Sequence, residues 1–402
     1  MYPSSATSFT PNGTNVCRIT LASEGEWADF STLRFACTVE NQSATQPLKP
    51  WSTSGNSLFQ RVREMIGGSC IADVLHYNRT SEVFQNLLEP TEWQFSEGML
   101  WLGGSYSNET HAIGMGAMIY EADRHPQPGS IPAGGRYTCL QRLMTSLVKA
   151  DKLVPLRVAP VTYELTLANP ADCFEAAYSQ QYALTNCYMV LDLITLDSGV
   201  QNSYYSQLLR GGALAVSLPQ YHSLYFPIAP GTAATSIVVQ RALTRNVGVF
   251  ITFQSATGHL TSFPNPNFPV LMAGWPDPAN PSLQDGTFSF QLQLGSKLWP
   301  EQAMNSQAEM YETLRKAIGT HNQDIKSCSL DRKDYYTDSF VLGVDLEKNL
   351  GDPFSAVNTR AGDVSRLNFQ GIDPNANITG CFVHLIGSAI CELRESGAFL
   401  FD

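Results

Sequence analysis

Two pairs of neighbouring carboxylates are the first residues in the sequence that could do chemistry. Asp192 and Asp197 flank the end of a strand-like segment. Asp331 and Asp334 enclose an Arg-Lys dipeptide. Two carboxyl groups about 5 to 9 Å apart can hydrolyse a glycosidic bond, one as acid and the other as base or nucleophile. Exposed turn and helix-cap residues give the same pattern, so we assign these residues to turns and caps and keep carbohydrate cleavage as an alternative.

Aromatic residues in segment 89–136 are a second candidate for ligand binding. Trp93, Trp101 and Tyr106 lie in a stretch rich in Gly, Trp, Met and Tyr. Such rings could form a platform on which a sugar stacks. Large rings also pack a loop onto its own domain, and their polar atoms then find buried partners. Both interpretations remain open from the sequence alone.

Histidine and cysteine show no spacing that would bind a metal. There is no Cys-x-x-Cys, His-x-His or His-x-x-x-His motif, and neither a P-loop nor a Gly-x-Ser-x-Gly motif occurs. We therefore predict no catalytic, cofactor-binding or metal-binding residue, no cofactor and no enzyme activity. We expect the nine cysteines to be free buried thiols: Cys17, Cys37, Cys70, Cys139, Cys173, Cys187, Cys328, Cys381 and Cys391. The seven histidines are His76, His111, His125, His222, His259, His321 and His384, and we expect His384 to be a buried strand residue.

Composition points to a globular chain with covered surfaces. The chain has 402 residues, of which 43% are hydrophobic and only 15% charged, whereas soluble domains carry about 25% charged residues. The net charge is −11 and no cluster of Lys and Arg occurs, which disfavours direct binding of nucleic acid. The first residues do not resemble a signal peptide, and the longest apolar stretch, 381–391, is too short to span a bilayer. We therefore expect the five sequons, at Asn12, Asn41, Asn78, Asn108 and Asn377, to be unmodified.

Alternation of apolar and polar residues predicts many short strands. A period of two is typical of a strand with one buried face. Repeated short strands separated by turn residues indicate a β-sandwich or barrel. The clearest patterns cover residues 33–39, 161–167, 247–253, 288–294 and 340–346, and further strands are expected at 184–195, 367–369, 381–386 and 390–401.

Three short helices are predicted. Ser306 and Glu309 form a capping box, followed by Tyr311, Leu314 and Ile318 on one face and by Gly319 as the end. A second helix is expected from about Thr80, ending at Pro90, and a third over 198–210. The predicted inward residues of the second helix are Val83, Phe84, Leu87 and Leu88.

The two halves of the chain repeat the same order of elements. In each half an alternating strand meets glycine, at 67–68 and at 295, and a short helix follows. A long irregular region comes next, and two or three closing strands end the half. We therefore predict a duplicated all-β unit with the boundary near residue 198. Long loops are expected at 89–136 and 254–286.

Several passages resemble the double jelly-roll major capsid proteins of icosahedral double-stranded DNA viruses, a lineage that includes polinton-like viruses, virophages, adenoviruses and tailless phages. Segment 67–73 leads to His-Tyr-Asn-Arg at 76–79, which is similar to the strand, turn and helix entry of the polinton-like proteins. Segments 153–157, 161–167 and 182–197 resemble the closing strands of a first jelly roll. Trp-Pro-Glu at 299–301 precedes the helix with Glu-Met-Tyr at 309–311, and 393–402 resembles a last strand.

The resemblance implies an all-β fold of two tandem eight-stranded jelly-roll β-sandwiches with a few short helices, covering 1–198 and 199–402. It also implies a structural protein of the virion, assembled inside the host cell. It implies a homotrimer in which six sandwiches form a pseudo-hexameric capsomer that tiles an icosahedral shell. The expected partners are other copies of the chain, neighbouring capsomers and minor capsid or penton proteins, and an internal membrane is compatible with it. No direct sequence-specific binding of nucleic acid is expected. Two alternatives remain: a two-domain sandwich that binds or cleaves carbohydrate, and a viral vertex or spike component.

Overall fold

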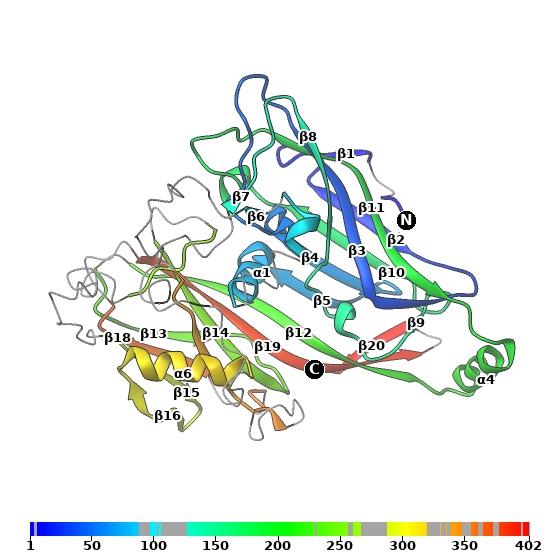
Figure 1. Ribbon diagram of the computed structural model, residues 1–402. Coiled ribbons are helices and arrows are strands. Elements are labelled where there is room, and N and C mark those ends of the chain that lie inside the picture. Colours follow the sequence, from blue (N-terminus) through cyan, green and yellow to red (C-terminus); the bar gives the residue numbers. More distant parts are fainter. Residues whose placement is uncertain are drawn as a thin grey trace, which may run out of the picture. The chain divides into compact units, whose positions relative to one another are not determined.

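The structure is a computed structural model in which the chain is built mainly of antiparallel β-strands (Figure 1). It describes residues 1–3, 6–87, 97–102, 104–105, 127–229, 231–255, 260–266, 288–319, 330, 335, 339–347, 355–360, 365–372, 378–394 and 397–401. The predicted loops 89–136 and 254–286 therefore lie mostly outside the described residues. No described helix is both long enough and apolar enough to cross a membrane.

Eight strands in the first half form two sheets with a Greek-key order. Numbered along the chain, the first, eighth, third and sixth strands make one sheet, and the second, seventh, fourth and fifth make the other. This is the strand order of a jelly roll. The strands are β1 (Ser8–Phe9), β2 (Val16–Leu21), β3 (Trp27–Asn41), β4 (Phe59–Ile66), β5 (Ser69–Leu75), β8 (Arg136–Gln141), β10 (Val161–Leu167) and β11 (Tyr182–Ile194). The short β9 (Val154–Pro155) pairs with β3, and β6 (Gly104–Ser105) pairs with β7 (Gln127–Pro128).

The second half repeats this order strand for strand. One sheet has the order β12-β19-β14-β17 and the other β13-β18-β15-β16. The prediction of two tandem eight-stranded jelly rolls is thereby confirmed. The strands are β12 (Leu214–Pro227), β13 (Ala234–Val239), β14 (Asn246–Ser255), β15 (Ser289–Leu294), β16 (Lys297–Met304), β17 (Leu342–Asp345), β18 (Ser365–Gln370) and β19 (Ile378–Arg394), and an extra strand, β20 (Gly397–Phe401), pairs with β19.

The chain divides into two compact units whose limits fall within strands. The first unit contains Met1–Leu218 together with Ile390–Phe401, and the second contains Pro219–Ala389. The end of β19 and all of β20 therefore belong to the first unit, where β20 packs beside β5. Two separate strands were predicted at 381–386 and 390–401. This prediction is wrong in detail, because β19 runs without a break from 378 to 394.

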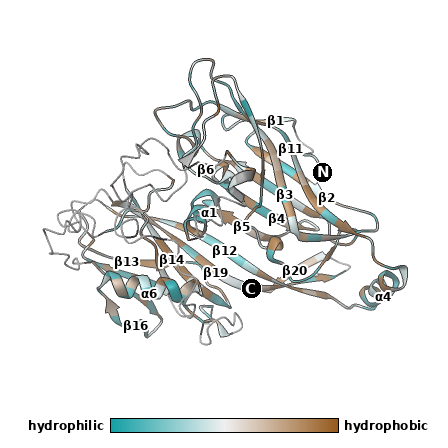
Figure 2. Cartoon of the chain, viewed as in Figure 1, coloured by the Kyte–Doolittle hydropathy of each residue, from teal (hydrophilic) through white to brown (hydrophobic). Residues whose placement is uncertain are grey.

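Alternation places one face of most strands in a core. In β10 every second residue from Val161 to Leu167 is buried, and β15 behaves in the same way. The middle of β3 and of β14 is instead buried on both faces, so the prediction of a half-buried strand is wrong there. Figure 2 shows apolar residues along both strands. The core of the second unit contains five phenylalanines from four segments, with ring centroids 5.4 to 6.3 Å apart: Phe253, Phe288, Phe290, Phe340 and Phe369.

The three predicted helices are present, with one start displaced. The helix expected from Thr80 is α1 (Tyr77–Asn86), which begins three residues earlier because His76 takes a left-handed conformation with φ of 50°. Phe84 and Leu87 are half-buried, and Leu88 lies outside the described residues. The helix expected at 198–210 is α4 (Ser198–Leu209). Shorter helical turns among the described residues are η1 (Gly55–Leu58), η2 (Glu97–Leu100), η4 (Leu147–Lys149) and α3 (Pro170–Cys173).

The capping box starts α6 (Gln307–Ala317) as predicted. The Ser306 hydroxyl accepts the Glu309 N–H at 3.2 Å, and the Glu309 carboxylate accepts the N–H of Asn305. The buried face consists of Gln307, Met310 and Leu314. Tyr311 and Ile318, which were predicted to share one face with Leu314, are half-buried. The helix packs on β17, where Gly343 leaves room for Leu314.

Candidate functional site

The predicted carboxylate pairs do not form a catalytic site among the described residues. Asp197 is the N-cap of α4, and its carboxylate accepts the Gly199 N–H at 2.8 Å. Asp192 is exposed on β11. Both carboxylates are thus open to solvent, and Asp197 is the cap residue that the first interpretation predicted. Asp331 and Asp334 lie outside the described residues.

The aromatic platform is not supported by the one member that can be placed. Trp101 is 2% exposed, and its Nε1–H donates to the Ser52 carbonyl at 3.3 Å. A ring buried in this way packs its own segment and offers no open face to a sugar. Trp93 and Tyr106 lie outside the described residues.

No metal-binding group was found in the part of the chain that the structure describes. Within it, no three His, Cys, Asp or Glu side chains gather closely enough to hold a metal ion. His384 is buried in β19, as predicted, with its ring stacked on Phe382. Among the sequons, Asn41 and Asn78 are buried and cannot carry a glycan in the folded chain.

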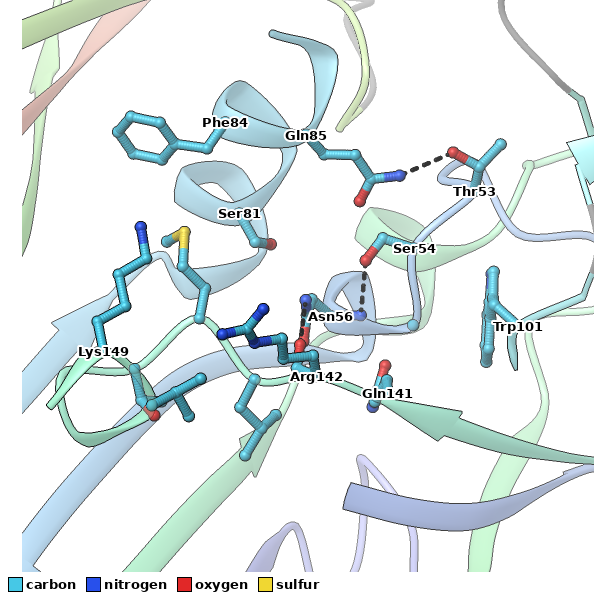
Figure 3. A pocket seen from close by; sticks show the side chains of 15 residues that line it. Thr53, Ser54, Asn56, Ser81, Phe84, Gln85, Trp101, Gln141, Arg142 and Lys149 are labelled. Atoms are coloured by element: carbon cyan, nitrogen blue, oxygen red, sulfur yellow. Dashed lines mark hydrogen bonds between the residues drawn. The ribbon is translucent and has the colours of Figure 1, made fainter. Parts of the chain in front are cut away.

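A pocket of about 310 Å³ opens in the first unit (Figure 3). Its wall joins η1, α1 and the segment that follows β8. The Arg142 and Lys149 side chains extend toward α1, and none of the fifteen lining residues is a carboxylate. Gln141 is 5% exposed, and neither of its amide atoms has a hydrogen-bond partner in the described structure. The pocket can therefore accept a small polar or anionic group, but it contains no nucleophile paired with a base.

The polar wall of the pocket is fixed by a chain of hydrogen bonds. The Tyr77 hydroxyl donates to Asn56 Oδ1 at 3.1 Å and accepts the Met144 N–H at 2.7 Å. Asn56 Nδ2 donates to the Arg142 carbonyl at 3.1 Å, and Gln85 Nε2 donates to Thr53 Oγ1 at 2.9 Å. These bonds tie α1 and the segment after β8 to η1 and the residues just before it.

A fully buried carboxylate lies beneath this region. Glu64 of β4 accepts the Ser146 N–H at 2.9 Å and the Leu147 N–H at 3.4 Å, at the start of η4. Burial raises the pKa of Glu64, although these hydrogen bonds oppose the shift. Burial and the nearby Glu64 carboxylate raise the pKa of the Tyr163 hydroxyl. Glu64 accepts hydrogen bonds from two backbone N–H groups at the start of a helical turn, where such groups have no partner within the turn. Its role here is therefore structural.

Seven of the eight described cysteines are buried thiols, as predicted, and Cys70 is exposed. Two of them lie side by side on neighbouring strands: the sulfur atoms of Cys37 on β3 and Cys139 on β8 are 3.4 Å apart. No local sequence pattern indicates this pair, because the two residues are 102 positions apart. Cys328 lies outside the described residues.

A group of exposed apolar residues follows the end of β11 into α4. We call Val190, Leu193, Ile194, Val200 and Leu209 the β11–α4 surface; they are 36% to 70% exposed. Only Leu208 of α4 is buried. The helix is held to the first unit by ring contacts of Tyr204 with Trp27 and of Tyr205 with Arg157. An exposed apolar group of this kind is typical of a surface that binds another protein.

The sheet edges carry further exposed apolar residues. They include Val238 on β13 and both Leu298 and Trp299 on β16 in the second unit. In the first unit, Leu75 of β5 and Phe399 and Phe401 of β20 are exposed. Uncovered edge strands pair readily with other chains unless something shields them. The described surface therefore offers several regions that could contact other chains.

Comparison with known proteins finds the same fold in viral capsids. No family model and no curated protein matches the sequence. The PBCV-1 virus capsid matches with a TM-score of 0.58 and 14% identity over 96% of this chain and 92% of that one. The capsid structure of the Sputnik virophage matches with a TM-score of 0.54 and 7% identity over 100% and 89%. The mavirus major capsid protein matches with a TM-score of 0.53 and 10% identity over 99% and 88%.

These matches extend over nearly the whole chain, so they concern both halves together. The protein has the double jelly-roll fold of viral major capsid proteins. With sequence identities of 7% to 14%, these matches show that the fold is shared. The function of this chain has to be argued from its own residues.

Proposed function

We propose that the chain is the major capsid protein of an icosahedral double-stranded DNA virus. The observation that carries the proposal is the repetition of one strand order in both halves, in a fold shared along the full chain with the mavirus major capsid protein. A protein that acts as a monomer has no evident need for two similar sandwiches in one chain. In a shell, each sandwich occupies one position of a regular lattice.

The expected assembly is a trimer with pseudo-sixfold shape. Closed rotational symmetry is the usual form of homo-oligomers, and three chains with two sandwiches each supply six similar blocks. The sheet limits support the division at 198/199: the strands of the first two sheets end at Ile194, those of the next two begin at Leu214, and α4 lies between. The trimer would tile the facets of the shell together with neighbouring capsomers and minor capsid or penton proteins.

The β11–α4 surface is the contact between copies that we propose. A helix of twelve residues with a single buried side chain gains little from its own unit, and short isolated helices are marginal in water. Val200 and Leu209 are nine residues apart and so lie on opposite sides of α4. Neighbouring copies that enclose the helix from both sides would supply the missing burial. The low charge of the chain agrees with this, since the cores of interfaces are depleted of charged residues.

The proposal assigns the chain a structural role without enzyme activity. The Asp197 carboxylate caps a helix and Trp101 is buried, so the carbohydrate alternative loses the two described residues on which it rested. With a net charge of −11 the chain is unsuited to neutralising phosphates. Its place would be the virion shell, assembled inside the host cell.

The assembly state of the purified protein tests the proposal. Light scattering with size-exclusion chromatography should give a particle of three times 44.1 kDa, and electron micrographs should show blocks of hexagonal outline. A stable monomer at micromolar concentration that forms no larger particle would contradict the proposal. Saturable binding on a glycan array would favour the carbohydrate alternative. Copy number in purified particles separates a facet protein from a vertex or spike protein.

A further inference from the structure

Cys37 and Cys139 stand directly opposite each other on paired antiparallel strands. β3 and β8 pair with Cys37 opposite Cys139, between the pairs Ala36–Leu140 and Thr38–Thr138. Both thiols are buried, with exposed fractions of 0% and 1%. Their sulfur atoms are 3.4 Å apart, which is close to van der Waals contact.

The backbone here already fits a covalent bond between the two sulfur atoms. Residues directly opposite in an antiparallel pair have Cα atoms about 4.5 to 5.5 Å apart. Disulfides span Cα distances of about 4.4 to 6.8 Å. Rotation of the two side chains is therefore sufficient to bring the sulfur atoms to bonding distance, and the strands need not separate.

We propose that Cys37 and Cys139 are a disulfide-forming pair that staples β8 to β3 under oxidising conditions. The oxidant is a small disulfide such as glutathione disulfide. The thiolate of one cysteine attacks it, forms a mixed disulfide and releases one glutathione thiolate. The thiolate of the second cysteine then attacks the protein sulfur of that mixed disulfide and releases the other glutathione. The two protein thiols lose two hydrogen atoms in total, and the glutathione disulfide becomes two thiols.

The position of β8 explains how the oxidant reaches buried thiols. Hydrogen bonding to Cys139, together with burial, raises the pKa of Cys37 in the closed structure, and a protonated thiol is a poor nucleophile. Among the described strands, β8 lies at the edge of its sheet and pairs with β3 alone. Edge elements open locally at a smaller free-energy cost than central ones. Opening of β8, or a stage of folding before it docks, would expose both thiols and restore their ordinary reactivity.

The pair has no counterpart in the second jelly roll, although the strands correspond. β14 and β17 occupy the places of β3 and β8 in the strand order. Their four paired positions, Gly248–Asp345, Val249–Val344, Phe250–Gly343 and Ile251–Leu342, contain no cysteine. The staple would therefore stabilise the first unit alone.

A second thiol pair in the same core makes the test selective. Cys17 on β2 lies near Cys187 on β11, and this neighbouring thiol, together with burial, raises the pKa of Cys17. Mass spectrometry of peptides therefore has to show which sulfur atoms are joined. The proposal requires the bond between Cys37 and Cys139, whatever the state of the other two.

The experiment uses the full chain in a glutathione redox buffer at pH 8. One sample is incubated in the native state and another is refolded from urea in the same buffer. Both are quenched with acid, alkylated and digested without reduction. We expect a cross-linked peptide containing Cys37 and Cys139, formed faster on refolding, and a mixed disulfide of glutathione at exposed Cys70 as a check that the oxidant is active. Absence of the cross-link in both samples would overturn the proposal.

Stability supplies an independent readout. A disulfide that closes a loop of about 100 residues raises the thermal unfolding midpoint of a unit of this size by about 10 °C. Cys37→Ala should remove from the difference between oxidised and reduced protein the part that the Cys37–Cys139 bond supplies, about 10 °C. Cys381→Ala is the matched control, because Cys381 is also fully buried in a strand, β19 of the second unit, and it should keep that difference. An equal oxidation shift in the parent and in Cys37→Ala would contradict the inference even if a cross-link were found.

Discussion

Shortening two exposed apolar side chains of α4 should weaken assembly without harming the folded subunit. The change is the double variant Val200→Ala and Leu209→Ala. Leu209 is 70% exposed and Val200 is 56% exposed in the subunit, so the unfolding free energy hardly depends on them. Alanine also has the highest helix propensity. The helix itself should therefore become slightly more stable, which separates an effect on association from an effect on folding.

The size of the effect follows from the exposed fractions. Each buried carbon is worth about 0.8 kcal/mol. Leu→Ala removes three carbons and Val→Ala removes two. Because a neighbour can bury only the fraction of each side chain that is exposed in the subunit, each energy is multiplied by that exposed fraction. The loss is then about 1.7 kcal/mol for Leu209 and about 0.9 kcal/mol for Val200. Three contacts in a trimer sum to about 8 kcal/mol, or between five and six powers of ten in the trimer dissociation constant.

Dilution experiments measure this change. The midpoint concentration of a monomer–trimer equilibrium varies as the square root of the dissociation constant, so it should rise by about 700-fold if neighbours cover both residues fully. Mass photometry or light scattering over a dilution series reads the midpoint directly. The control variant is Gln207→Ala, a polar exposed residue on the same helix, which should leave the midpoint in place. An unchanged midpoint in the double variant, with intact thermal unfolding, would refute the assignment of the β11–α4 surface to the contact.

Three further predictions concern the folded subunit. Ser306→Ala removes the hydroxyl that accepts the Glu309 N–H and should lower the unfolding free energy by about 1 kcal/mol in urea titrations. Gly343→Ala would place a methyl group 2.8 Å from a Leu314 methyl and 3.1 Å from its Cα, so the thermal midpoint should fall, with a cost of about 1 to 3 kcal/mol. Glu64 has a raised pKa when folded, so its contribution to stability is complete below its unfolded pKa and is lost as pH rises through the folded value. Relative to the parent, Glu64→Gln should therefore become less destabilising from pH 5 to pH 8 in urea titrations.

Each of these variants has a matched control. Ser203→Ala replaces an exposed serine inside α4 and should not destabilise the chain. Gly25→Ala adds a methyl group that meets no atom within 4 Å, and should be tolerated. Glu301→Gln alters an exposed carboxylate and should leave the pH dependence of stability as in the parent. If Glu64→Gln followed the parent curve at every pH, the burial argument for Glu64 would fail.

Sequence patterns correctly predicted those strands and helix ends that depend on residues close together in the chain. Period two at 161–167 and 288–294 corresponds to strands with one buried face. The capping box of Ser306 and Glu309 located the start of α6 within one residue. The start of α1 was missed because His76 makes no side-chain cap bond, so no cap residue marked it.

Features that depend on distant strands could not be predicted. Cys37 meets Cys139 because the third strand of a jelly roll pairs with the sixth, and nothing near either residue encodes that pairing. The burial of Ala36 and Thr38 was missed for a related reason. Alternation of apolar and polar residues predicts one buried face of the strand, whereas in the fold both faces of β3 are covered at these positions. The low charge indicated hidden surfaces, but the fold had to be known before Val200 and Leu209 could be recognised as exposed.

The membership of residues 390–401 in the first compact unit has a consequence for synthesis. Chains emerge from the ribosome in order, and an N-terminal domain usually folds while the rest is being made. Here the first unit lacks the end of β19 and all of β20 until the second unit has been translated. β5 would meanwhile stay without the strand that packs beside it. The first unit is therefore completed only after residues 390–401 have been translated, and any association of copies that needs this unit would have to wait until then.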